Sequence, residues 1–221
     1  MKYRYHSLFS WKGIGGKLIG LYFLLLTFGV VPLHAQDMLD YFQSMPAEMT
    51  PYLTIAQKTE LAEKSRQQEA AQLVNALGDT TRIETATDDF LSIKMSSVHQ
   101  IQLRRLPLAN GQAIIGMVRT YFAPAADSSL DYFDTTWNRV ETKGHLVGLE
   151  VEKLHRQPEN MSKTDYEALL ALLDPTMLQF CFEPETTDLI VKQSMPLLSN
   201  EERTQITPII QAIRLPWRPM R

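Results

Sequence analysis

The chain has 221 residues, with 22 basic and 25 acidic side chains, 44% hydrophobic residues and one cysteine. This composition excludes collagen-like, disulfide-stapled and highly charged disordered proteins. A chain of this length removes about 70% of its unfolded surface from water on folding, so it needs neither a metal nor a disulfide to be stable. No catalytic or ligand-binding signature is recognisable, so the sequence indicates where the protein is located and how it is built more than what it does.

The N-terminus has the pattern of an export signal. Residues 1–17 contain four basic residues and no acid, and an apolar run follows over residues 18–31. That run is shorter than the roughly 20 residues of a spanning helix, which favours a cleaved signal over an uncleaved anchor. Leu33-His34-Ala35 is an imperfect small-x-small site, so we expect cleavage after Ala35. Residues 1–35 are predicted to be a signal peptide and the protein to be periplasmic, with a cell-surface location left open.

The expected mature chain is acidic. Removing residues 1–35 takes away four basic residues and no acid, which changes the formal net charge from −3 to −7. A binder of nucleic acid needs clustered Lys and Arg, so nucleic acid is excluded as a partner. The lone Cys181 cannot form an internal disulfide, and we expect it to be a buried strand residue rather than a nucleophile.

Two helices are expected at the start of the mature chain. Met38, Tyr41, Phe42 and Met45 form one apolar helical face that follows Asp37 as N-cap, and Pro46 ends it. Residues 54–57 match a capping box, and residues 57–77 are rich in helix-forming residues. We therefore expect a second helix that extends toward Gly78, with a break or an exposed stretch around residues 64–69.

A period of two begins near Arg82 and indicates strands. Residues 90–95 and 100–104 alternate apolar and polar side chains, which predicts strands buried on one face. Asn110-Gly111 predicts a tight hairpin with positive φ at both residues, leading into a central strand over residues 112–122. Residues 129–133 and 137–140 are expected to continue the meander.

The remaining third of the chain predicts one more helix and more strands. Residues 145–157 fit either a strand or a mixture of loop and strand, and Ser162 begins a helix whose apolar stripe must be buried. Strands are expected at residues 177–182, 188–193 and 209–215, with a capped turn at residues 199–202. The predicted fold class is α+β, with a predominantly antiparallel sheet of meander and hairpins and a few helices packed against it. Residues 36–221 are expected to form a single domain, and a further division near residues 141–161 stays open.

Motifs for catalysis, metals and cofactors are missing from the sequence. There is no nucleophile elbow, phosphate-binding loop, dinucleotide glycine pattern or His/Cys cluster at metal-ligand spacing. We therefore expect no metal site and no cofactor. Four carboxylates near strand ends are able in principle to pair as acid and base in a glycosidase-like cleft, although turn and cap duties explain them equally well. They are Asp88, Asp89, Asp131 and Asp134.

A dense aromatic run covers residues 121–137. Most of it is expected in the sheet core, and any exposed remainder is a candidate binding face. The candidate binding residues are Tyr121, Tyr132 and Trp137.

Several short stretches carry a resemblance to a known family. They are Tyr41-Phe42-x-x-Met45-Pro46, Thr87-Asp-Asp-Phe-Leu91 and Ser129-Leu-Asp-Tyr-Phe133-x-x-x-Trp137. The chain resembles a family of exported Bacteroidetes proteins classified only as a domain of unknown function, family 3256, over most of its mature length. The resemblance implies a Gram-negative envelope and therefore the periplasm, and it implies neither an activity nor site residues.

Three functional hypotheses follow. The first is a non-enzymatic binding or assembly module for an envelope protein or glycan, which a flat exposed aromatic patch would favour. The second is a hydrolase of envelope polymers that uses scattered carboxylates or a histidine, which a deep cleft with two carboxylates would favour. The third is a structural subunit that leaves a sheet edge or an apolar patch uncovered in the isolated protein.

Overall fold

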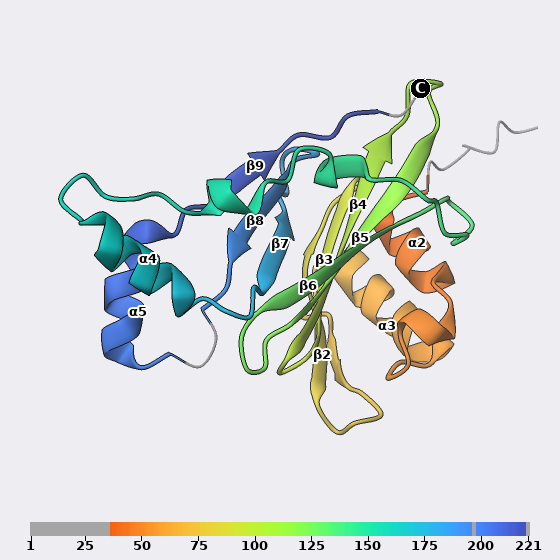
Figure 1. Ribbon diagram of the computed structural model, residues 1–221. Helices are drawn as coiled ribbons and strands as arrows, with labels where there is room; N and C mark the ends of the chain where they lie inside the picture. The colour runs from red at the N-terminus through yellow and green to blue at the C-terminus, as the bar shows by residue number, and fades with distance from the viewer. Residues whose placement is uncertain (1–35, 196–197, 220–221) are drawn as a thin grey trace, which may run out of the picture. The chain divides into compact units, whose positions relative to one another are not determined.

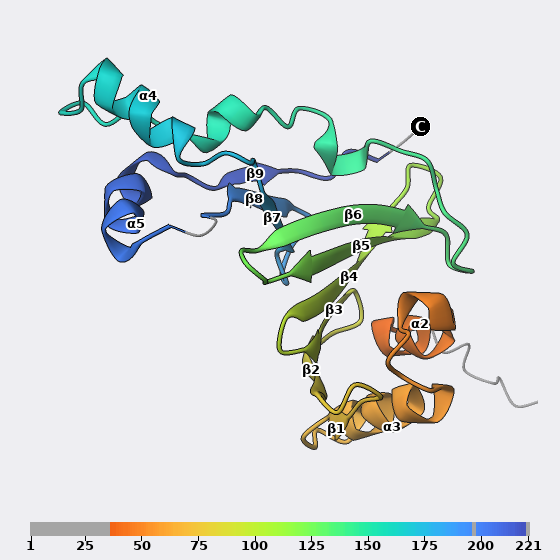
Figure 2. The same ribbon diagram turned by 60° about the horizontal axis from the view of Figure 1, so that its bottom comes forward.

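The computed structural model describes residues 36–195 and 198–219, which belong to one compact unit, Gln36–Arg221. The predicted export signal, residues 1–35, lies outside the described residues. Two antiparallel sheets, one of six strands and one of three, pack with helices in layers (Figures 1 and 2). The predicted α+β class with an antiparallel meander is confirmed.

Two capped helices form the first layer. Helix α2 (Met38–Ser44) begins at Asp37 and helix α3 (Ile55–Arg66) begins at Thr54, and both N-termini have the reciprocal bonds of a capping box. A short turn of 3-10 helix, η1 (Ala47–Met49), joins them. Apolar side chains of both helices pack on one face of the six-stranded sheet, which removes them from water.

The second helix is shorter than the sequence predicts. It ends at Arg66, and residues after it form strand β1 (Gln72–Val74) and the turn before β2 (Thr80–Ala86). Gln68 takes a positive φ of 58°, which leaves the helical region. The good helix formers after Arg66 lack an apolar stripe to bury, so pairing of β1 with β2 decides the conformation instead.

The main sheet is a meander in chain order. After β2 come β3 (Phe90–Ser96), β4 (His99–Pro107), β5 (Ala113–Tyr121) and β6 (Asp127–Phe133), each paired with its predecessor. The predicted hairpin joins β4 to β5, although only Gly111 has a positive φ, and the Asn110 side chain accepts from the Gln112 N–H. The turn is therefore wider than the two-residue hairpin expected.

The second sheet covers the other face of the first. It consists of β7 (Leu178–Phe182), β8 (Leu189–Gln193) and β9 (Ile213–Leu215). The prediction that β3 and β4 are buried on one face only is wrong, because the polar residues Ser92, Gln102 and Arg104 are also buried, and Gln102 and Arg104 bond to the second sheet and the turn after β7. Gln102 Oε1 accepts from the Phe182 N–H at 3.0 Å, and Arg104 donates to the Pro184 carbonyl at 2.9 Å. These bonds satisfy polar groups that burial would otherwise leave without partners.

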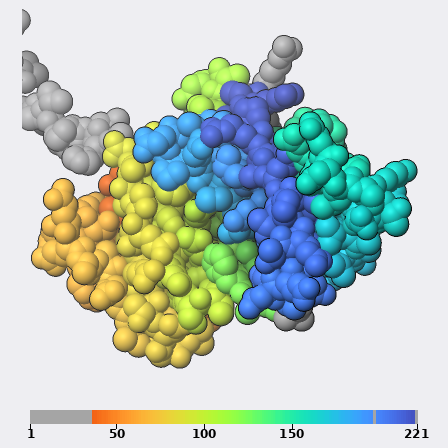
Figure 3. Space-filling model, turned by 90° about the vertical axis from the view of Figure 1, so that its left-hand side faces the viewer, coloured from red at the N-terminus to blue at the C-terminus, as the bar shows by residue number. Residues whose placement is uncertain are grey.

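The segment between the two sheets is irregular. Residues 145–157, for which the sequence fits either a strand or a mixture of loop and strand, lie mostly in loop and in the 3-10 turns η2 (Gly144–Leu146) and η3 (Val151–Leu154). Helix α4 (Lys163–Ala171) begins at Ser162 as predicted, but the helix itself contains no fully buried residue. It packs beside α5 (Asn200–Ile206), which is followed by η4 (Thr207–Ile209), and both helices lie beyond the sheets in Figure 2. Figure 3 shows yellow and green strands between the orange N-terminal layer and the blue and cyan C-terminal layer.

Gly116 allows the two sheets to approach closely. A Cβ at this position on β5 would lie 2.8 Å from Leu106 Cδ1 and 2.8 Å from Phe182 Cζ, and both of those side chains are fully buried. Contacts this short require a shift in a close-packed interior. The absence of a side chain at Gly116 therefore sets how near β7 lies to β5.

We expect Gly116→Ala to lower the free energy of unfolding by about 1–3 kcal/mol, because the added methyl group overpacks the space between the sheets. The measurement is chemical denaturation followed by circular dichroism. Ala113→Val is the control, since Ala113 lies on the same strand but is only half-buried, and its effect should stay within about 0.5 kcal/mol. Equal stability of Gly116→Ala and the parent would show that the sheets are not closely packed there.

Candidate functional site

The three aromatic residues predicted for binding do not share a surface. Tyr132 is 3% exposed and Trp137 is 7% exposed, and they belong to different core clusters. Tyr121 is 51% exposed and ends β5, whereas Trp137 follows β6 beyond the opposite end of the β5–β6 pair. Of the three, the structure therefore leaves Tyr121 accessible to a partner, and its role in binding stays a prediction.

Tyr132 holds the irregular segment against the sheet. Its hydroxyl accepts from the His145 N–H at 2.9 Å and lies 3.0 Å from His145 Nδ1, while His145 Nε2 lies 2.7 Å from the Thr187 carbonyl. Gly144 has a positive φ of 46°, and a Cβ there would lie 2.3 Å from the Tyr132 hydroxyl. Burial raises the pKa of Tyr132 to about 12 and lowers that of His145, which favours the neutral form of both side chains. Both rings therefore have structural partners.

Trp137 lies in a loop in which the Asp134 carboxylate accepts hydrogen bonds from neighbouring loop residues. It has a positive φ of 68° and donates from Nε1 to Ser44 Oγ at 3.2 Å. Asp134 accepts bonds from the side chains and backbone of Asn138 and Thr136, and these bonds lower the pKa of Asp134 to about 2. The Asp134 carboxylate therefore serves to close the loop.

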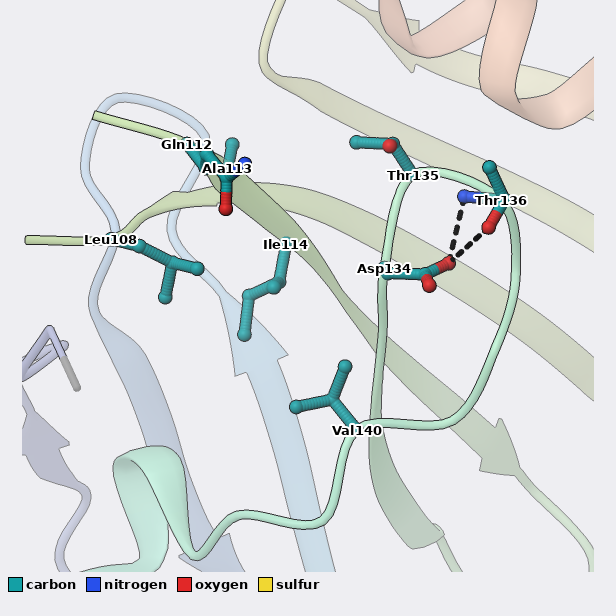
Figure 4. A pocket seen from close by; sticks show the side chains of 8 residues that line it. All are labelled: Leu108, Gln112, Ala113, Ile114, Asp134, Thr135, Thr136 and Val140. Carbon is teal, nitrogen blue, oxygen red and sulfur yellow. Dashed lines mark hydrogen bonds between the residues drawn. The ribbon is translucent and has the colours of Figure 1, made fainter. Parts of the chain in front are cut away.

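This loop borders an open hollow of about 600 Å³. Figure 4 shows Leu108, Ile114 and Val140 pointing into it, with Asp134 turned toward Thr136. Asp134 is the one carboxylate that lines it, so the hollow does not hold a pair for acid–base catalysis.

The other predicted carboxylates have separate surroundings. Asp131 is buried and pairs with Arg119 and, at 2.8 Å, with Arg139. Asp89 lies 3.4 Å from Arg105 Nε, at the turn before β3. Asp88 is an exposed residue of the same turn. The structure thus gives these carboxylates turn and ion-pair roles, in keeping with the simpler of the two explanations.

Cys181 departs from the expected burial. It lies on β7 as predicted, but the residue is exposed, and its Sγ accepts a hydrogen bond from Gln102 Nε2 at 3.6 Å. The pairing of β7 with β8 places Phe180 and Phe182 on the inner face, and alternation then directs Cys181 outward.

His99 is buried beneath Tyr121. The two rings stack in parallel with their centres 4.4 Å apart, and His99 is 5% exposed. Neither ring nitrogen of His99 has a hydrogen-bond partner among the described residues. Burial, together with the nearby Arg119 guanidinium, lowers the pKa of His99 from 6.5 to about 4. His99 is therefore neutral at physiological pH and supports the Tyr121 ring from below.

Exposed apolar side chains gather around Tyr121 at one end of the main sheet. Of the eight large hydrophobic residues exposed in the described part of the chain, six belong to this end, with between 38% and 75% of their surface accessible. We call these six the apolar rim: Ile55, Val74, Leu77, Val98, Tyr121 and Phe122. Of these six residues, the sequence analysis names only Tyr121 as a candidate binding residue.

Hydrogen bonds join the segments of the rim. Gln57 Nε2 donates to the Val74 carbonyl at 3.1 Å, which ties the start of α3 to β1. Asp79 Oδ2 accepts from the Ser97 N–H at 2.6 Å, which ties the β1–β2 turn to the β3–β4 turn. The Phe122 N–H donates to the Val98 carbonyl at 2.9 Å, which ties that turn to the end of β5. These turns lie at the lower end of the strands in Figure 1, so the segments that carry the rim residues come together at one end of the main sheet.

The rim is also poor in charge. The four segments that form it, residues 54–57, 74–79, 96–98 and 121–126, contain one charged residue, Asp79, although 21% of the whole chain is charged. The Asp79 carboxylate is occupied by the N–H groups of Ser97 and Thr80, and these bonds lower its pKa. Turn segments that carry apolar residues and few charges are the signal in the sequence that would have located this surface. Outside these segments, the Lys94 charge lies near Asp79 and the Arg119 charge lies near His99.

Two kinds of site are not found in the described residues 36–195 and 198–219. No group of three or more His, Cys, Asp or Glu side chains gathers closely enough to hold a metal ion. No helix in this part of the chain is both long and apolar enough to cross a lipid bilayer.

Comparison with known proteins identifies the family. A family model described as "Protein of unknown function (DUF3256)" matches residues 30–221. The chain belongs to this family. A solved structure titled "Structure of a domain of an uncharacterized protein from Porphyromonas gingivalis W83" is similar, with a TM-score of 0.66 and 22% identity, and covers 83% of this chain and 96% of that chain. This similarity shows that the DUF3256 chain shares the fold of that structure. A search of curated proteins finds no significant match.

We expect Tyr132→Phe to lower the free energy of unfolding by about 1–3 kcal/mol, because it leaves the buried His145 N–H and Nδ1 without their partner. Chemical denaturation measures the change. Tyr121→Phe removes a hydroxyl from an exposed ring and should change stability by less than about 0.5 kcal/mol. A similar effect of the two variants would argue against the Tyr132–His145 contact.

We expect stability to fall as pH is lowered from 7 to 4, in part because of His99. Its pKa is about 4 in the folded protein and near 6.5 when unfolded, so the unfolded chain binds the extra proton in this window and is favoured by it. His99→Phe keeps the stacked ring and removes the titration. The loss of unfolding free energy between pH 7 and pH 4 should then shrink by roughly 2 kcal/mol. An unchanged pH profile would show that His99 is protonated without penalty.

Proposed function

We propose that this protein is an exported periplasmic binding module, without catalytic activity, whose apolar rim docks onto an envelope protein. The observation that carries the proposal is the gathering of six exposed apolar side chains on one charge-poor surface. Exposed apolar patches rimmed by polar residues mark interaction sites in soluble proteins, and depletion of charge is typical of interface centres. The export pattern of residues 1–35 and the family resemblance support the envelope location.

The chemistry of the rim favours a protein over a glycan as partner. A glycan presents many hydroxyl groups that need hydrogen-bond partners when water is removed. The rim offers four aliphatic and two aromatic side chains, and its one carboxylate, Asp79, already accepts two backbone N–H groups. Aliphatic and aromatic side chains of a protein partner would bury this surface without leaving polar groups unsatisfied.

The backbone at the rim is suited to side-chain docking rather than to strand addition. Strand β1 lies at the edge of the sheet but has only three residues, and its Val74 carbonyl is occupied by Gln57. Short and covered edge strands disfavour pairing with another chain. The partner is therefore expected to bind across the turns.

The test is site-specific photocrosslinking in the organism that encodes the protein. A photoreactive residue at Leu77 or at Val98 should crosslink one and the same envelope protein, because both positions lie in the rim. Val147 is the matched control, since it is an apolar residue 50% exposed and lies outside the rim. Leu77→Asp should abolish the crosslink formed by a photoreactive residue at position 98, whereas Val147→Asp should not. Neither substitution should lower the melting temperature, because both residues are exposed.

Two results would contradict the proposal. One is the same set of crosslinked products from Val147 as from Leu77 and Val98, which would show non-specific proximity. The other is a crosslink from Val98 that persists in Leu77→Asp, which would show that the apolar surface does not hold the partner.

A further inference from the structure

A second hollow adjoins the apolar rim. Its volume is about 260 Å³, and it lies between the β5–β6 turn, the outer face of β7–β8 and helix α5. Residues 124–126 line it, and these residues continue directly from the rim residues Tyr121 and Phe122. Figure 3 shows the bright green β5–β6 turn beside the dark blue of α5. A partner that covers the rim would therefore reach this hollow.

The charges of the hollow are of one sign. Lys192 and Arg203 are among the ten residues that line it, and none of the ten is acidic. Neither side chain forms an ion pair with another of the described residues, although most other arginines in this part of the chain do. The hollow therefore carries two cations without an acidic partner among the described residues, in a chain whose expected mature net charge is −7.

Hydrogen bonds hold the segments around the hollow in place without involving the Lys192 ammonium group or the terminal nitrogens of Arg203. Arg203 Nε donates to the Leu198 carbonyl at 3.1 Å, and its two terminal nitrogens have no hydrogen-bond partner among the described residues. Lys192 pairs across the strands with Gln179, which places both side chains on the outer face of β7–β8. Ser194 Oγ donates to the Ala126 carbonyl, which holds the β5–β6 turn against the end of β8.

We infer that this hollow binds a carboxylate of the protein partner that docks on the rim. The inference rests on the proposed function, and it specifies the partner as a segment in which an acidic side chain, or a terminal carboxylate, stands beside apolar residues. A guanidinium and an ammonium group together provide charge-assisted hydrogen bonds to a carboxylate, and the Gln179 amide adds a neutral donor. The apolar rim provides the contact area with the partner, and the cations of the hollow fix the orientation in which the partner binds.

The test selects peptides from a random library on the folded unit Gln36–Arg221 and measures their affinities. Selected peptides should carry Asp or Glu within a few residues of large apolar side chains. Replacing that acid by its amide should lower the affinity of the peptide about tenfold. The double variant Lys192→Glu with Arg203→Glu should lower the affinity for the acidic peptide by at least as much. The same double variant should prefer the peptide in which the acid is changed to Lys, which a merely structural role of Lys192 and Arg203 would not produce.

The control is the double variant Lys143→Glu with Arg156→Glu. It changes the net charge by the same amount, at exposed residues that do not line the hollow, and should leave affinities within about twofold. Peptides whose binding requires Leu77 but shows no preference for an acid would overturn the carboxylate site and leave the rim intact. Peptides unaffected by Leu77→Asp, or no selected peptides at all, would count against the rim and the carboxylate site together.

Discussion

Burial of both faces of the main sheet is the constraint on which this structure depends. Strands β3, β4 and β5 have side chains in the core on either side, so the sheet is stable only with a layer on each face. The N-terminal helices supply one layer and the C-terminal strands supply the other. The two meet the sheet differently: the helices contact it through apolar side chains, whereas the second sheet comes close enough to pass over Gly116 and to bond with Gln102.

In this arrangement, several polar side chains that are chemically suited to catalysis instead form hydrogen bonds within the fold. Gln102 and Arg104 bond to the second sheet, Tyr132 and His145 bond to each other, and Asp134 closes its own loop. Groups held in this way are oriented by the fold and are satisfied within it. The binding surface that we propose accordingly lies at one end of the sheet, where turns emerge from the core, rather than on its faces.

In the proposed function, the apolar rim and the neighbouring hollow together select one kind of partner. Six exposed apolar side chains favour association through burial of surface, and their release from water does not depend on orientation. The two cations of the hollow add direction, because a carboxylate reaches both only from a limited set of poses. The structural hypothesis of an uncovered apolar patch and the binding hypothesis thus describe the same surface, and they differ in whether the partner stays bound.

By itself, the sequence determined the parts that local rules control. The capping boxes at Asp37 and Thr54, the strand β3, the glycine of the β4–β5 turn and the helix after Ser162 follow from local sequence patterns, and all are present. Only the tertiary structure decided what lies on the second face of each strand. Alternation in β3 and β4 cannot reveal a covering sheet from residues 178–215, so buried polar residues were taken for solvated ones, and Tyr132 and Trp137 were assigned to a surface that the core occupies. The rim escaped prediction for the same reason, since its members come from four separate segments that only the sheet brings to one end.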